Sequence, residues 1–156
     1  MKLDLDRYVP GLLLWVSNRL TSSASLLYRT RFGIGVTDWR VLAYFHVYPW
    51  STPASACELM GIDKAAVSRS VAILVASGYL QSRPLGQRRI EYTLTDAGRH
   101  LHDQIILLAL EREEALLEGF SAEERAVLIR LLHRMLGNLP AVGQVDVEQE
   151  STLLEP

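Results

Sequence analysis

The sequence predicts a mainly α-helical protein with one small β-hairpin. Most of the chain carries apolar residues at three- and four-residue spacing, which is the period of an amphipathic helix. Residues 80–94 instead hold two short segments, and the second alternates apolar and polar side chains as a strand does. The chain has 156 residues, 49% of them apolar, which is enough for a core in one domain over residues 1–139.

The first predicted helix spans residues 8–31, where apolar residues form one stripe before Gly33 and Gly35 interrupt it. A second, short helix is predicted to begin after a cap at Thr37. It should end before Pro49, because a residue that precedes proline resists the α conformation.

Two more short helices follow. Pro53 can occupy a first helical turn without loss of a hydrogen bond, which predicts a helix over residues 54–60 that stops at Gly61. Asp63 is predicted to cap the next helix, which should end at Gly78. Two short helices joined by about three residues, one of them a glycine, are typical of a helix-turn-helix.

The rest of the chain predicts a hairpin and two longer helices. The hairpin has strands over residues 80–83 and 89–94 and a mobile tip over residues 84–88. A long helix follows over residues 96–118, with Thr95 as its cap.

Ser121, with a glutamate three residues later, forms a capping box that opens the last helix. Pro140 is predicted to end that helix at about residue 139. Residues 140–156 should then form an acidic and flexible tail.

This order of elements describes a winged helix-turn-helix flanked by helical arms. Four stretches carry a more specific pattern: Asp63-Lys64-Ala65-Ala66-Val67-Ser68-Arg69, Gly78-Tyr79-Leu80, Arg88, and Leu94-Thr95-Asp96-Ala97-Gly98. In these stretches and their spacing, residues 8–139 resemble the MarR family of bacterial regulators. The resemblance implies a cytoplasmic transcriptional regulator, a ligand-responsive repressor that binds a pseudo-palindromic operator as a homodimer. Its dimerisation arms would be residues 8–31 and 96–139, and its DNA-binding head residues 37–95.

The residues of the head fit that expectation on chemical grounds. A recognition helix needs small side chains for close approach to the major groove, with hydroxyl and basic groups to reach bases and phosphates. Between Gly61 and Tyr92, five basic side chains stand against two acidic ones, although the whole chain has a net charge of −2. The expected contacts with double-stranded DNA are Lys64, Ala65, Ala66, Ser68 and Arg69 in the helix, and Arg83, Arg88 and Arg89 in the wing.

The sequence departs from the family pattern at two places. The resemblance implies an acidic residue two positions before the wing arginine, but Gly86 stands there. The recognition helix is apolar on every side in its second half, so a phosphate contact is expected to be missing at Ile73.

The arms carry more apolar stripes than a small head can cover, which predicts that a second copy of the chain buries them. In the family resemblance, effectors bind between the arms and the head. This implies a pocket for a small aromatic or phenolic effector, with the simple alternative that the aromatic residues are core. The candidate lining residues are Trp15, Arg19, Trp39, Tyr44 and His46.

Other classes of function find little support. No nucleophile–base pair, glycine-rich phosphate loop or metal-ligand spacing is visible, so no enzyme, metal or cofactor is expected. Cys57 has no partner in the chain, the first residues lack a signal peptide, and the longest apolar run, residues 105–110, is too short to span a membrane. Two alternatives stay open: a winged helix used only for protein association, and a regulator of the same fold triggered by a metal or an oxidant.

Overall fold

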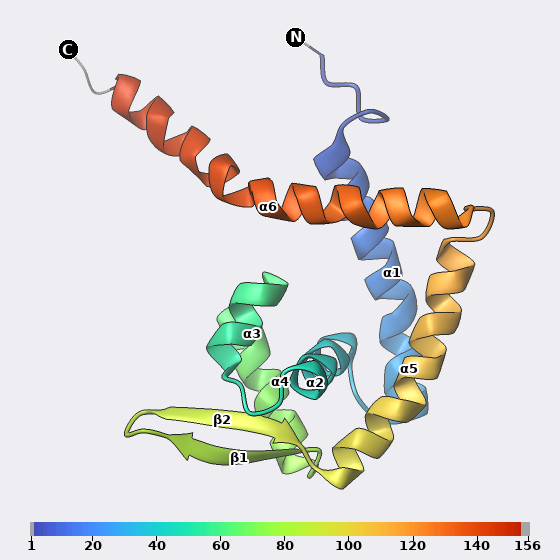
Figure 1. Cartoon of the computed structure of the whole chain (residues 1–156), viewed down its shortest axis with the longest axis vertical. Helices are drawn as coiled ribbons and strands as arrows, with labels where there is room; N and C mark the ends of the chain where they lie inside the picture. The colour runs from blue at the N-terminus through green and yellow to red at the C-terminus, as the bar shows by residue number, and fades with distance from the viewer. Residues whose placement is uncertain (1, 154–156) are drawn as a thin grey trace. The chain divides into compact units, whose positions relative to one another are not determined.

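The computed structural model describes residues 2–153, and these form six helices and one two-stranded hairpin (Figure 1). The predicted mainly α fold with a β-hairpin wing is therefore confirmed. The chain divides into two compact units, one up to Ala109 and one from Leu110 on. The first unit contains the predicted head.

Four helices open the chain: α1 (Val9–Phe32), α2 (Val36–Val47), α3 (Pro53–Met60) and α4 (Lys64–Ala76). α3 and α4 pack on each other as a helix-turn-helix, and α2 packs on α4 from behind. The predicted start of α2 is wrong, because Gly35 and not Thr37 is its cap. The cause is Asp38, whose carboxylate accepts the Gly35 N–H at 2.8 Å and so allows Thr37 to be helical.

The core of this unit forms where α2, α4, the wing and α5 meet. Its largest fully buried side chains are Val41, Leu42, Phe45, Val67, Leu74, Leu94 and Ile105. Complete burial of one such side chain contributes roughly 1.5–3 kcal/mol to folding. This core holds α4 by one face and leaves its other face to solvent.

The wing consists of β1 (Leu80–Leu85) and β2 (Arg89–Leu94), paired antiparallel with Leu85 opposite Arg89. β1 is thus two residues longer than predicted, and the tip is a three-residue turn. Gly86 opens the turn with φ 65°, a conformation that glycine adopts without strain. Ser51 adds a third short segment, since its amide and carbonyl both bond to Tyr92 at the base of β2.

The C-terminal helices are α5 (Asp96–Leu116) and α6 (Ala122–Leu153). Both predicted caps are confirmed. Thr95 Oγ1 accepts the Gly98 N–H at 3.0 Å and donates to the Gly78 carbonyl at 2.6 Å. Ser121 Oγ accepts the Glu124 N–H at 3.2 Å, and Glu124 Oε2 accepts the Ser121 N–H at 2.8 Å.

The predicted helix end at about residue 139 is wrong, because α6 continues through Pro140 to Leu153. A proline inside a helix removes one hydrogen bond and crowds the preceding turn, which bends a helix but need not end it. Figure 1 shows such a bend in the C-terminal half of α6. Residues 154–156 of the predicted tail lie outside the described residues.

Candidate nucleic-acid interface

The start of α4 has the geometry predicted for a recognition helix. Asp63 Oδ2 accepts the Ala66 N–H at 3.0 Å, which confirms the predicted cap. Of the five residues of this helix that are predicted to contact DNA, four are exposed and Ala66 is half-buried. The residues on the other side of the helix are buried: Val67, Ser70, Val71 and Leu74. The exposed four are Lys64, Ala65, Ser68 and Arg69. Small, hydroxyl and basic groups therefore share one open face.

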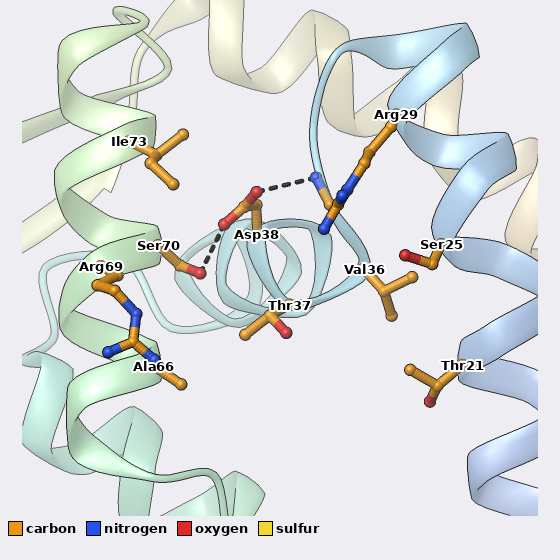
Figure 2. A pocket seen from close by; sticks show the side chains of 11 residues that line it. Thr21, Ser25, Arg29, Val36, Thr37, Asp38, Ala66, Arg69, Ser70 and Ile73 are labelled. Atoms are coloured by element: carbon orange, nitrogen blue, oxygen red, sulfur yellow. Dashed lines mark hydrogen bonds between the residues drawn. The ribbon is translucent and has the colours of Figure 1, made fainter.

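Two hollows flank α4. One, of ≈ 290 Å³, lies between α4, α2 and α1 and is lined in part by Arg29 and Arg69 (Figure 2). The other, of ≈ 440 Å³, lies between α4 and the wing and is lined in part by Ser68 and Tyr92. Ile73 lines the first hollow and is 47% exposed, so the position where the sequence predicts a missing phosphate contact faces solvent as an apolar side chain.

Asp38 lies in the wall of the first hollow and connects α2 with α4. Oδ1 accepts a hydrogen bond from Ser70 Oγ of α4 at 2.6 Å, while Oδ2 accepts the Gly35 N–H at the start of α2. Figure 2 shows the carboxylate between the two helices, with both bonds drawn. The sequence analysis missed this pair. Its one available signal is a serine inside the buried stripe of α4, since a buried hydroxyl needs a partner.

Arg83 lies at the middle of the wing and its charge is already engaged. Its Nε bonds to Glu91 Oε2 at 2.8 Å on the facing strand, and its guanidinium carbon lies 4.2 Å from the centre of the Trp50 ring. Trp50 has φ 56°, which is unusual for a bulky residue. These contacts give Arg83 a role in holding the wing, whether or not it also meets a phosphate.

Arg88 and Arg89 lie at the wing tip, Arg88 in the turn and Arg89 as the first residue of β2. Both are exposed, and neither is in an ion pair with another described residue. Two free guanidinium groups at the end of a protruding hairpin are well placed to meet an anionic partner. The wing tip and the open face of α4 together form the candidate interface.

The five residues predicted to line an effector pocket lie in three surroundings. Trp15 and Arg19 line a hollow of ≈ 320 Å³ on α1. Trp39 and His46 both contact His102 of α5, whose ring lies 5.4 Å from the first and is stacked at 3.7 Å on the second. Tyr44 is buried and packs against aromatic neighbours within α2 and just after it. An effector pocket shared by all five stays a prediction.

His46 is the group through which we expect stability to depend on pH. Slight burial lowers the pKa of His46 below 6.5, the nearby His102 lowers it further, and Asp103 partly opposes both. Protonation is thus easier in the unfolded chain, so this contribution to stability is full above pH about 6.5 and is lost as the pH falls through the folded pKa.

We therefore expect the urea midpoint of unfolding to fall between pH 7.5 and pH 5, and His46→Gln to flatten that fall. His133→Gln, at an exposed position on α6, serves as the control and should retain the slope of the parent protein. An equal slope in His46→Gln and the parent would contradict the assignment.

In residues 2–153, no group of three or more His, Cys, Asp or Glu side chains is arranged around a common metal position. Among the helices of the described chain, none is both long and apolar enough to cross a bilayer.

Comparison with known proteins finds a family that this part of the chain resembles. Residues 32–90, which run from the end of α1 to the start of β2, match the MarR family. No curated protein matches the chain.

Solved structures match over much more of the chain. A MarR/EmrR family transcriptional regulator from Acinetobacter sp. ADP1 shares 29% identity and a TM-score of 0.82, over 89% of this chain and 99% of its own. A mutant MarR from E. coli complexed with operator DNA shares 22% identity and a TM-score of 0.71, over 87% of this chain and 99% of its own. The PcaV transcriptional regulator from Streptomyces coelicolor, in complex with its natural ligand, shares 23% identity and a TM-score of 0.69, over 88% of this chain and 97% of its own. Residues 32–90, which contain α2, α3, α4 and β1, therefore match the MarR family, and almost the whole chain has the fold of a regulator of this family.

Proposed function

We propose that this protein is a sequence-specific DNA-binding transcriptional regulator, not an enzyme, that acts in the cytoplasm as a homodimer on a pseudo-palindromic operator. The observation that carries the proposal is the open face of α4, beside a wing whose two tip arginines form no ion pair with any described residue. The E. coli MarR of the same fold is complexed with operator DNA, which supports the same use of these elements.

Each element of the interface has a distinct task in this proposal. α4 enters the major groove by its N-terminal half, where Ala65 and Ala66 allow close approach and Ser68 reaches a base edge. Lys64 and Arg69 neutralise phosphates and set the register of the helix on the duplex. The wing tip lies along the minor groove.

The test begins with the selection of an operator from a random pool of duplex DNA. On that operator, Arg69→Ala should weaken binding by more than ~1 kcal/mol, because it loses a phosphate contact. Ser68→Ala should change base preference more than overall affinity, because a hydroxyl contact reads a base. Footprints and affinities of both variants that match the parent would mean that α4 does not read DNA.

A homodimer is supported by apolar surface that a single chain leaves open. The N-terminal half of α1 exposes large apolar side chains, and so does α6. Monomeric proteins seldom expose so many large apolar side chains along a helix. Those on α1 are Leu12, Leu13, Leu14, Trp15 and Val16, and those on α6 include Ile129, Leu131, Leu136, Leu139 and Val142.

We expect light scattering at micromolar concentration to give twice the chain mass of 17.5 kDa. A stable, folded monomer would remove the homodimer from the proposal. The two heads of a dimer would meet successive major grooves about one helical turn apart, which requires an operator with two similar half-sites.

The proposal includes repression and a response to a small aromatic or phenolic effector. PcaV, which shares the fold, is in complex with its natural ligand, and α1 of this chain has a hollow beside Trp15 and Arg19. An aromatic side chain and a guanidinium suit an aromatic acid, since one stacks and the other pairs with a carboxylate. Release of the parent protein from its operator by such acids, with loss of release in Arg19→Ala, is the expected result.

A further inference from the structure

We propose that Asp38 is a positioning residue, which sets the rotation of the recognition helix α4 through its hydrogen bond with Ser70. The inference rests on the proposed DNA-binding function of α4. It assigns to a carboxylate on α2 a part of the operator affinity, although its negative charge by itself opposes binding to DNA.

The bond is short and sheltered. Ser70 is 3% exposed, and its Oγ donates to Asp38 Oδ1 at 2.6 Å. Hydrogen bonds to an ionised acceptor are shorter and stronger than those between neutral groups. Because Oδ2 is held by the Gly35 N–H at 2.8 Å, the carboxylate cannot turn freely and α4 is tied to a fixed point at the start of α2.

The other contacts that hold α4 do not fix its rotation as sharply. Val67, Val71 and Leu74 attach the helix to the core by apolar burial, which has no preferred direction. A short hydrogen bond does have one. Ser70 follows Arg69 in sequence, so a change in the rotation of α4 at Ser70 moves Arg69 and Ser68 with it.

The charge of Asp38 makes the proposal testable, because a role in charge and a role in position predict opposite changes in operator affinity when Asp38 is replaced by alanine. Asp38 lines the same hollow as Arg29 and Arg69 (Figure 2). If charge alone mattered, Asp38→Ala would tighten binding, because it removes a group that repels phosphate. If position matters, the same variant weakens operator binding.

The experiment measures parent and variants on the selected operator and on unrelated duplex DNA, at several salt concentrations. Ser70→Ala, which keeps the charge of Asp38 and its bond to Gly35, should weaken operator binding about tenfold. It should leave the affinity for unrelated DNA and the salt slope unchanged, since the phosphate contacts remain. Ser77→Ala, at an exposed serine just after α4, is the matched control and should bind as the parent does.

A double-mutant cycle completes the test. Asp38→Ala should also weaken operator binding, and the double variant should lose little more than Asp38→Ala alone, because Ser70 has no bond left to lose once Asp38 is removed. If Asp38→Ala is unfolded at the assay temperature, Asp38→Asn takes its place: its Oδ1 can still accept the Gly35 N–H, while the charged acceptor of Ser70 is lost and only a weaker neutral bond can form there.

The outcomes separate this proposal from the proposed function. Tighter binding by the Asp38 variant, or parental affinity in Ser70→Ala, overturns the positioning role and leaves DNA binding intact. A tenfold loss on unrelated DNA as well would assign the effect to general loosening of the head and would also overturn it. No selected operator for the parent would instead overturn the proposed function itself.

Discussion

Replacement of Arg88 and Arg89 together by alanine is expected to lower operator affinity about a hundredfold and to reduce the salt slope by about two units. Each free guanidinium that neutralises a phosphate releases about one counterion, and the wing tip carries two of them. Arg88→Ala alone should reduce the slope by about one unit. It should also flatten any preference for A·T pairs beside the half-sites, because an arginine in a narrow minor groove senses its width.

Fluorescence anisotropy titrations at several salt concentrations measure both quantities. The double variant Arg130→Ala and Arg134→Ala is the matched control, because it removes the same charge from exposed positions on α6, outside the proposed interface. A control with the same loss would assign the effect to net charge. An unchanged slope in the wing variants would mean that α4 binds DNA alone.

Gly98→Ala should be the most destabilising of the single changes, at about 3 kcal/mol, or about 6–12 °C in Tm. A Cβ at this position would lie 2.1 Å from the carbonyl oxygen of Tyr79, far inside van der Waals contact. That carbonyl also accepts the Thr95 N–H at 3.0 Å, so the first turn of α5 is fixed against the base of the wing. Either the helix or the base of β1 must move.

Urea or thermal unfolding of Gly98→Ala measures this cost. Gly137→Ala is the control with the opposite expected sign, because Gly137 lies within α6 and a Cβ there meets no atom within 4 Å. It should stabilise the protein by up to ~1 kcal/mol, since alanine favours a helix more than glycine does. Unchanged stability in Gly98→Ala would mean that α5 and the wing can separate slightly at no cost.

The order of elements could be predicted from the sequence because the signals that start helices are local. Asp63, Thr95 and Ser121 each cap a helix through a bond to an amide three residues away. Where two local signals compete, the prediction fails. At α2, the side chain of Asp38 returns to Gly35 and moves the helix start ahead of Thr37.

In the candidate site too, the features set by local sequence could be predicted, and the contacts between residues far apart in the chain could not. The open face of α4 follows from helical periodicity and could be predicted. The bond from Asp38 to Ser70 spans 32 positions, and the stack of His46 on His102 joins two helices, so no spacing rule reveals either. The sequence predicts Arg83 as a DNA contact together with Arg88 and Arg89, and only the strand register reveals that Glu91 lies opposite Arg83 and pairs with it.

The pairing of Ser51 with Tyr92 fixes the wing at its base and leaves its tip free to move. Its root is clamped by two backbone bonds, Ser51 N–H to Tyr92 carbonyl at 3.3 Å and Tyr92 N–H to Ser51 carbonyl at 2.9 Å. Residues 81–90 are all exposed, and beyond the contacts of Arg83 with Trp50 and Glu91 the tip is held mainly by the pairing of the two strands. A hairpin that is held at one end moves most at the other end, where Arg88 lies. If the wing meets DNA as proposed, Arg88 can follow minor grooves of different width while α4 keeps its position in the major groove, and a stiffer hairpin would distinguish those widths more sharply.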